Sequence, residues 1–354
     1  MESKISEANS QIIILVCEKF TLMAISSDAF NFLLLIITME SLKPKIAIIG
    51  AGNVGSTFAF SLMISGLARE IVLVDKNEIL ANGECMDLNH GLSFAHPTKI
   101  YAAGFEGCKD ADIVVITAGA KQKPGQSRID LVKDNVTLFN AIIPAITKYA
   151  ADAILLVVTN PVDILTYVTL KISGLPPNRV IGSGTVLDTA RLKYMISEYC
   201  KVDPSNIHAY IIGEHGDTEL PLWSNATIGG MAIEKYCSDY AGLGNAKDEL
   251  AEIFEKVKNA AYQIIQAKGA TNYSIALSLV KITQSIVRNE NSILPVSTLI
   301  TDYYGVSDVC ISIPSHVNIN GVDQYLKLEL SDQEQKLFKY SANSLKEIIK
   351  TIEL

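Results

Sequence analysis

The short polar segment Ile212-Gly-Glu-His215-Gly-Asp217 holds the residue types best suited to moving a proton. Neutral imidazole can remove a proton from an alcohol near pH 7, and imidazolium can return it. The flanking glycines would let a substrate approach the ring, and a neighbouring acid could hold the ring in place. Proton transfer of this kind accompanies hydride transfer to or from a carbonyl carbon, so His215 is the first predicted catalytic residue.

An acid and an arginine lie upstream in Leu187-Asp188-Thr-Ala-Arg191, three residues apart on one face of a predicted helix. One interpretation is an intrahelical ion pair, which contributes only a few tenths of a kcal/mol. The other interpretation gives the two side chains separate tasks. Arg191 would bind a substrate carboxylate through two parallel hydrogen bonds, and Asp188 would orient His215 and stabilise its protonated form.

A glycine fingerprint, Gly50-Ala-Gly52-Asn53-Val54-Gly55, lies between a predicted strand at 45–49 and a predicted helix at 54–65. Such a string alone could be an ordinary glycine-rich turn. Asp75, however, ends the next predicted strand, twenty residues past Gly55. A carboxylate there can accept hydrogen bonds from both ribose hydroxyls and would repel a 2′-phosphate, so the combination predicts NAD rather than NADP. Lys76, beside Asp75, leaves strict cofactor preference open.

Four short aliphatic runs alternate with helical stretches along the first half of the chain. The runs are at 45–49, 70–74, 112–116 and 153–158, and the helical stretches include 54–65 and 135–149. Nearly continuous apolar runs are typical of strands buried on both faces of a parallel sheet. The predicted fold class is therefore α/β, with a Rossmann-type doubly wound sheet followed by an α+β substrate domain.

Two loops follow strands at the carboxyl edge of this sheet, where cofactor and substrate bind in doubly wound folds. The polar segment 117–128 is a candidate lid, and within it Thr117, Ala118 and Gly119 are predicted to contact the cofactor. Closing the lid would bring Arg128 against a substrate carbonyl and exclude water. A solvated arginine on a surface loop is the alternative. Asn160, after the fourth strand, can donate an amide hydrogen bond to substrate or cofactor.

The composition excludes several classes of protein. A formal net charge of −8 argues against a nucleic-acid surface. The six cysteines form no Cys-x-x-Cys pair and no cluster with zinc spacing, which favours a reducing cytoplasm and no metal. Residues 1–38 contain no apolar stretch long enough to span a membrane and no positively charged start typical of a secretory signal. We expect Met39 to be the natural start, although an anchor or a signal are weaker alternatives.

These features give three predicted regions. Residues 1–42 form an amino-terminal extension outside the fold, 43–182 an NAD-binding domain, and 183–354 a substrate domain. Within the last region we expect helices at 248–268 and 273–288, and an antiparallel pair at 309–313 and 325–330 around Gly321. A capping box at 331–334 opens a final helix, whose predicted apolar side is Leu337, Leu345, Ile348, Ile349 and Ile352.

From about Pro44 onward the chain resembles the lactate/malate dehydrogenase family, and within it the bacterial L-lactate dehydrogenases. The resemblance covers the glycine fingerprint, Gln122-Lys-Pro-Gly, Asn-Pro-Val-Asp-Ile-Leu-Thr, Gly-Ser-Gly-Thr-Val-Leu-Asp-Thr-Ala-Arg and Gly-Glu-His-Gly-Asp-Thr-Glu, in that order. It implies an oxidoreductase of glycolysis and fermentation that interconverts pyruvate and L-lactate, binds NADH first and assembles as a homotetramer.

The resemblance also implies a role for each site residue. His215 would be the proton donor, Asp188 its partner, Arg191 the carboxylate anchor, Arg128 the carbonyl polariser, Gln122 the side-chain selector and Thr271 a part of the substrate pocket. Lys193 and His208 lie where related enzymes bind fructose 1,6-bisphosphate, although an interface histidine is an equal interpretation of His208. Relatives often have arginine where this chain has Lys193, and an acidic residue where it has Gln126.

Two other functions remain open at this stage. A malate dehydrogenase, or a broader 2-hydroxy acid dehydrogenase, would share every residue above except the selector. Its second substrate carboxylate needs a second cation in the lid, so a neutral Gln122 favours pyruvate, but the neighbouring Lys121 and Lys123 weaken that argument. A catalytically silent NAD-binding protein would be expected to lack the histidine, the acid or one of the arginines, and all of them are present.

Overall fold

The structure is a computed structural model that describes residues 44–120, 128–242 and 245–352. Residues 44–354 form one compact unit. The amino-terminal extension and most of the predicted lid, 121–127, therefore lie outside the described residues. Among the described helices, none is both long and apolar enough to cross a membrane.

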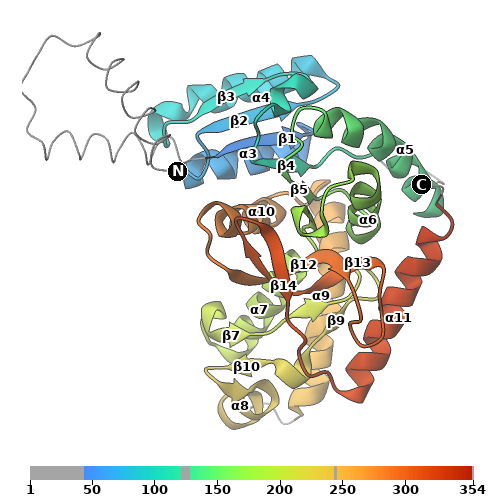
Figure 1. Ribbon diagram of the computed structural model, residues 1–354. Coiled ribbons are helices and arrows are strands. Elements are labelled where there is room, and N and C mark those ends of the chain that lie inside the picture. The colour runs from blue at the N-terminus through green and yellow to red at the C-terminus, as the bar shows by residue number, and fades with distance from the viewer. Residues whose placement is uncertain (1–43, 121–127, 243–244, 353–354) are drawn as a thin grey trace, which may run out of the picture. The chain divides into compact units, whose positions relative to one another are not determined.

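A nine-stranded sheet organises this unit, and six of its strands are parallel (Figure 1). They follow the order β3-β2-β1-β4-β5-β6, with the first strand in the centre. The strands are β1 (Lys45–Ile49), β2 (Glu70–Val74), β3 (Lys99–Ala102), β4 (Ile113–Ile116), β5 (Ile154–Val157) and β6 (Val180–Gly182). The chain order reverses between β1 and β4, and this switch point is where doubly wound folds bind dinucleotides.

Alternate side chains of the parallel strands enter two different hydrophobic clusters. In β1, Ala47 and Ile49 belong to one cluster, and Ile46 and Ile48 belong to the other. Side chains on a strand alternate between the two faces of a sheet, so this division means that both faces are buried. The nearly continuous apolar runs in the sequence have this cause.

Helices cover both faces of the sheet (Figure 1). On one side α3 (Asn53–Ser65), α4 (Glu78–His90) and α10 (Tyr273–Val287) contribute to the cluster of Ile46 and Ile48. On the other side α5 (Arg128–Thr147), α6 (Val162–Ser173) and α11 (Asp332–Ile349) contribute to the cluster of Ala47 and Ile49. The predicted doubly wound arrangement is therefore present.

The second half of the chain extends the same sheet with antiparallel strands. β12 (Ser292–Ile300) pairs with β6 through Ser297 and Gly182, and then with β13 (Val309–Asn318), which pairs with β14 (Gly321–Tyr325). The remaining helices are α7 (Val186–Cys200), α8 (Ile233–Tyr240) and α9 (Ala246–Lys268). Two small sheets comprise β7 (Ile207–His208), β10 (Thr227–Ile228) and β11 (Met231–Ala232), and β8 (Ile211–Ile212) with β9 (Leu220–Pro221).

Two local predictions were wrong. The last strand ends at Tyr325, so residues 326–330 are not part of it, and it begins directly at the Gly321 turn. Leu337 is 44% exposed, whereas its neighbour Phe338 is fully buried. One residue is about 100° around a helix, and the buried side of α11 passes through Phe338, Ala342 and Leu345. The predicted capping box of Ser331 and Glu334 is present.

Candidate active site

His215 lies in the loop between β8 and β9, and backbone hydrogen bonds to the nine-stranded sheet hold this loop in place. The backbone of Gly213 exchanges two hydrogen bonds with Ser312 of β13, with N···O distances of 3.0 and 3.1 Å. The backbone N–H of His215 itself donates to Oδ2 of Asp163, at 2.7 Å. Asp163 is 1% exposed and lies in the first turn of α6. The histidine backbone is thus held by two separate elements of the domain core.

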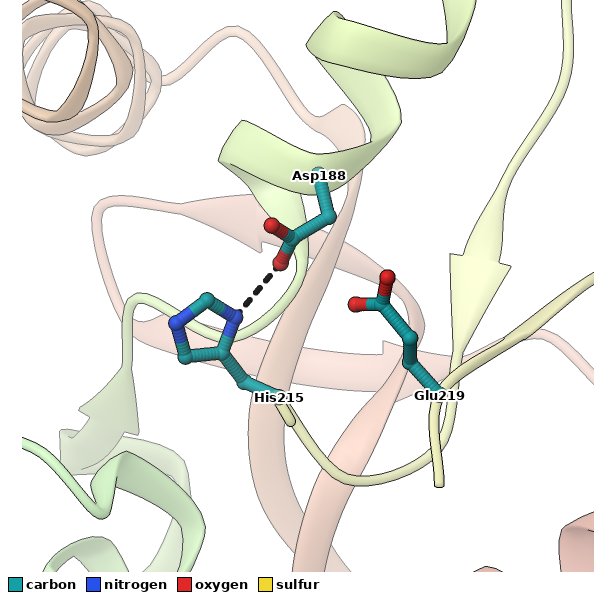
Figure 2. A group of neighbouring side chains, drawn as sticks. All are labelled: Asp188, His215 and Glu219. Carbon is teal, nitrogen blue, oxygen red and sulfur yellow. Dashed lines mark hydrogen bonds and ion pairs between the residues drawn. The ribbon is translucent and has the colours of Figure 1, made fainter. Parts of the chain in front are cut away.

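The imidazole ring of His215 is hydrogen-bonded to Asp188 on α7 (Figure 2). The distance from Nδ1 to Oδ2 of Asp188 is 2.5 Å, and the histidine side chain is 24% exposed whereas Asp188 is 4% exposed. An acid on Nδ1 fixes the ring orientation and leaves Nε2 as the nitrogen that can exchange a proton with a substrate. The predicted partnership of these two residues has the geometry of an acid–base dyad.

Electrostatics favour the charged form of this pair. Burial lowers the pKa of His215, but the charge and the hydrogen bond of Asp188 outweigh burial and raise the pKa to about 9. Burial raises the pKa of Asp188, but His215 and Arg191 outweigh burial and hold its pKa below the ordinary value. Each partner stabilises the ionised form of the other, so the imidazolium is the main species near pH 7.

Glu219 is a third member of this group that the sequence reasoning did not single out. Its carboxylate lies close to Asp188 and His215, and ligand atoms of the three residues are all within 4.8 Å of one another (Figure 2). Glu219 is 8% exposed. Burial and the like charge of Asp188 raise its pKa to about 8. The signal that could have indicated it is its place four residues after His215 in the same polar loop.

The composition of this group, two carboxylates and an imidazole, also occurs in metal sites. Among the described residues it is the group whose ligand atoms lie close enough together to hold an ion. Nδ1 of His215 is nevertheless already bonded to Asp188. The raised pKa of Glu219 keeps that carboxyl largely protonated at neutral pH. A metal ion needs deprotonated ligands, so the arrangement favours acid–base chemistry.

Arg191 lies one helical turn after Asp188, and its Nη1 atom is 2.8 Å from Oδ1 of that residue. Its side chain is 11% exposed. The intrahelical ion pair considered from the sequence therefore exists. It does not exclude a role in binding, because a guanidinium has five N–H donors and this contact uses one of its nitrogens.

The glycine fingerprint forms the turn from β1 into α3 and leaves room for a ligand. A Cβ atom on Gly55 would lie 1.9 Å from the carbonyl oxygen of Gly50, so only glycine lets helix and strand pack this closely. A Cβ atom on Gly52 would meet no described atom within 4 Å. Gly52 is the N-cap of α3, and among the described residues no side chain caps that helix. Its first amides can therefore bind a pyrophosphate.

Asp75 follows β2 and holds the glycine turn. Its Oδ2 accepts the N–H of Ala51 at 2.7 Å, and its Oδ1 accepts the N–H of Asn77 at 2.8 Å. Each carboxylate oxygen can accept a further hydrogen bond. A carboxylate fixed beside the turn in this way suits the ribose hydroxyls of NAD, and these residues therefore fit the predicted cofactor.

The loops after β4 and β5 are joined to each other by Asn135, a buried residue of α5 that the sequence did not point to. Its side chain accepts the N–H of Ala120 at 2.8 Å and donates to the carbonyl oxygen of Asn160 at 3.3 Å. The hydroxyl of Thr117 donates to the carbonyl of Gly50, at 2.9 Å. The segment Thr117-Ala118-Gly119 and Asn160 thus lie at the same carboxyl edge as the glycine turn.

The structure describes the remaining predicted site residues in less detail. Thr271 is half-buried between α9 and α10. Arg128 begins α5, but its side chain, like Gln122 and the other residues of 121–127, lies outside what the structure describes. Lys193 is half-buried on α7, and His208 is exposed on β7. α7 packs against β7.

The fold and the site together define a class. A doubly wound sheet with a glycine turn and an acid at the dinucleotide switch point, joined to a buried His–Asp pair and an arginine, is the arrangement of a nicotinamide-dependent dehydrogenase.

Comparisons with known proteins identify the family. Residues 44–182 match the model for the lactate/malate dehydrogenase NAD binding domain, and residues 185–354 match the model for the alpha/beta C-terminal domain of the same family. The L-lactate dehydrogenase of Acetivibrio thermocellus is 55% identical over 312 residues, which are 88% of this chain and 98% of that protein. The L-lactate dehydrogenase of Bacillus velezensis is 54% identical over 306 residues, which are 86% of this chain and 96% of that protein.

Solved structures of lactate dehydrogenases are also similar to this chain. The minor L-lactate dehydrogenase from Enterococcus mundtii has a TM-score of 0.85 and 41% identity, over 88% of this chain and 99% of that chain. A lactate dehydrogenase from a Medee basin deep-sea metagenome library has a TM-score of 0.84 and 44% identity, over 87% of this chain and 98% of that chain. The chain belongs to the lactate/malate dehydrogenase family. The family, the fold class and NAD as cofactor, all predicted from the sequence, are confirmed.

Proposed function

We propose that the chain acts as an NAD-dependent L-lactate dehydrogenase, interconverting pyruvate and L-lactate with His215 as the acid and base. The observation that carries this proposal is the 2.5 Å contact between Nδ1 of His215 and Asp188, with Arg191 bonded to the same carboxylate. The residues that we propose as proton donor and as carboxylate anchor thus share Asp188 as a partner. The relatives at 50–55% identity are named L-lactate dehydrogenases, which favours this activity over that of a malate dehydrogenase.

The substrate would be held by its carboxylate and its carbonyl oxygen. Arg191 binds the carboxylate, and its planar fork allows two parallel hydrogen bonds. Arg128 polarises the carbonyl when the lid closes, and Asn160 donates to the same region. Thr271 lines the pocket, and Gln122 faces carbon 3. In this arrangement each polar group of a small 2-oxo acid would interact with a side chain of the protein.

The glycine turn, Asp75 and the Thr117-Ala118-Gly119 segment would hold NADH, which would supply the hydride. In pyruvate reduction, Nε2 of His215 gives its proton to the substrate oxygen. Asp188 keeps the ring oriented and stabilises the imidazolium before transfer. In lactate oxidation the neutral ring takes the hydroxyl proton back. Asp163 holds the histidine backbone so that the distance to the substrate stays constant.

The activity is tested by following NADH absorbance in both directions. We expect NADH oxidation with pyruvate and NAD reduction with L-lactate, and little NAD reduction with D-lactate. Arg191 would fix the carboxylate, His215 the hydroxyl and the nicotinamide the direction of the transferred hydrogen, so lactate of only one hand could react. Equal rates with the two lactates, or no rate with either, would contradict the proposal.

The pKa of His215 predicts the pH dependence. Its raised value, about 9, means that the imidazolium persists well above neutral pH. The kcat/KM for pyruvate should therefore stay level through neutral pH and fall as pH rises through about 9, whereas that for lactate should rise over the same range. Both profiles report the coupled group of residues rather than one site.

Glu219 provides a variant for the same measurement. When ionised, its carboxylate raises the pKa of His215. Glu219→Gln removes that charge at constant shape, so the fall of kcat/KM for pyruvate should move to lower pH by about one unit. A matched control is Glu290→Gln, because Glu290 follows α10 and forms an ion pair with Lys281 of that helix. If the pH profile of Glu219→Gln coincides with that of wild type, the charge of Glu219 does not affect the pKa of His215.

We further propose that fructose 1,6-bisphosphate activates the enzyme at Lys193 and His208. Both side chains can donate to phosphate, and their elements pack together. Lysine offers one compact charge where arginine offers a fork, so activation should need more effector than in arginine-containing relatives. The effector should lower the pyruvate concentration that gives half-maximal rate. Saturation curves that are identical with and without it, at mildly acidic and at neutral pH, would reject the site.

We propose that the enzyme assembles as a homotetramer and acts in a reducing cytoplasm. Large apolar side chains are exposed on α3, α4 and α10, including Phe60, Ile64, Met86 and Leu277, all between 49% and 64% exposed. Exposed apolar surface of this kind is typical of protein interfaces. The five described cysteines are free thiols. A sedimentation mass of one chain would contradict the assembly.

A further inference from the structure

Two buried cysteines lie in contact far from the candidate active site. Cys200 is the last residue of α7, Cys237 lies in α8, and their Sγ atoms are 3.2 Å apart although 37 positions separate them in the chain. Cys200 is 6% exposed and Cys237 is not exposed. Both belong to the hydrophobic cluster between α7, α8 and α9, with Ile196, Ile233 and Leu250. This packing holds the two sulfur atoms together in the reduced protein.

The two thiols differ in acidity. The hydrogen bond with Cys237 lowers the pKa of Cys200, although burial and the carboxylate of Glu249 oppose this effect. The same hydrogen bond, together with burial, raises the pKa of Cys237. The thiolate is the reactive form of cysteine. Cys200 ends α7 and is the more exposed of the two, so it is the thiol that peroxide reaches first.

The other described cysteines lack this environment. Burial raises the pKa of Cys85 and of Cys108 to about 11, and raises that of Cys310 well above its ordinary value. Among the described residues, no other pair of sulfur atoms is in hydrogen-bond contact. These three residues are thus internal controls for the reactivity of a buried thiol in the same protein.

We propose that Cys200 and Cys237 are an oxidation site, at which hydrogen peroxide converts the contacting thiols into a reversible disulfide. The Cys200 thiolate attacks one peroxide oxygen, the O–O bond breaks, and the departing hydroxide is protonated to water. Cys237 then loses its proton and attacks the sulfur of the resulting sulfenic acid. The S–O bond breaks and a second water leaves. Two thiols are oxidised and one peroxide is reduced to two waters.

Forming the disulfide requires little movement of the two cysteine side chains. A disulfide needs an S–S distance of about 2.05 Å, so the sulfur atoms must approach by roughly 1.2 Å, and both side chains are at or near helix ends. The bond would close a loop that includes β7 to β11, and therefore both His215 and Glu219. Because a cross-link restricts the unfolded chain, the oxidised protein should unfold at a temperature several degrees higher. The catalytic groups need not move, so kcat/KM for pyruvate should change less than about twofold.

The test uses the full-length protein, reduced, freed of reductant and treated with graded hydrogen peroxide. Remaining thiols are alkylated in denaturant, and the protein is digested without reductant for mass spectrometry. We expect a linked peptide pair containing Cys200 and Cys237, lighter than the separate peptides by two hydrogen atoms, which disappears on reduction with dithiothreitol. Cys200→Ser and Cys237→Ser should each abolish the link, whereas Cys310→Ser should keep it.

Heat denaturation of oxidised and reduced samples gives a readout that is independent of activity. The rise in midpoint temperature after peroxide should occur in wild type and in Cys310→Ser, and should be absent in Cys237→Ser. Full alkylation of both thiols in the peroxide-treated protein would overturn the proposal. So would recovery of Cys200 as sulfinic acid without a link, or a link that joins a different pair.

Discussion

Replacing His215 by asparagine should lower turnover by about 10²–10⁴, the range typical of lost general acid–base catalysis. Asparagine keeps a polar side chain of similar reach, but it cannot donate and recover a proton near neutral pH. The glycine turn, Asp75 and the loop after β4 remain unchanged. NADH should therefore bind with nearly unaltered affinity. Steady-state rates and NADH fluorescence titration measure the two quantities on the same preparation.

The histidine experiment has a matched control within the chain. His90 is the exposed last residue of α4, and His90→Asn makes the same chemical change away from the proposed site. Its turnover should stay within about twofold of wild type, as expected for a surface substitution with small effects. Near-normal turnover in His215→Asn would remove the histidine from the proposed mechanism.

Gln122→Arg should exchange the substrate preference. In the proposed site Arg191 binds the carboxylate that pyruvate and oxaloacetate share, so discrimination depends on the group that faces carbon 3. If Gln122 faces that group, the second carboxylate of oxaloacetate would enter the closed lid without a cation of its own. A poorly paired buried charge costs several kcal/mol, which corresponds to a preference on the order of a thousandfold. The variant should gain kcat/KM for oxaloacetate and lose it for pyruvate.

A charge-matched control separates position from charge in this experiment. Gln126→Arg adds the same cation to the same predicted lid, four residues further on. If Gln122 selects the substrate, only the change at 122 should reverse the ratio of the two kcat/KM values. Equal effects of the two substitutions would mean that the overall charge of the lid decides. An unchanged ratio in Gln122→Arg would leave a general 2-hydroxy acid dehydrogenase.

Much of the fold could be predicted because its strands are buried on both faces. Continuous aliphatic runs at β1, β2, β4 and β5 allow few other structures, and each was placed to within one residue at either end. β3, β6 and β12 of the main sheet were missed. Lys99 and Tyr101 make the edge strand β3 less uniformly apolar, β6 has only three residues, and Pro295 interrupts the apolar run of β12. The end of β14 was missed for a related reason, since apolar residues at 326, 328 and 330 continue the alternation after strand pairing has ended.

The site was partly predictable for a different reason. His215, Asp188 and Arg191 lie in short segments whose residue types already suggest chemistry, and the structure brings all three together. Asp163 and Asn135 could not be assigned from the sequence, because their roles depend on contacts with residues 52 and 25 positions away. The same limit applies to the contact of Cys200 with Cys237. Gln122 and the Arg128 side chain remain predictions.

The most direct test of the account compares initial rates of NADH oxidation with pyruvate, oxaloacetate and 2-oxobutyrate on one preparation. We expect kcat/KM for pyruvate to exceed that for oxaloacetate by about a thousandfold, because Arg191 would bind one carboxylate and the neutral Gln122 would leave a second one without a cation. 2-Oxobutyrate, which adds one methylene, should fall below pyruvate by about 10- to 200-fold. A kcat/KM for oxaloacetate equal to or above that for pyruvate would contradict the proposed L-lactate dehydrogenase activity.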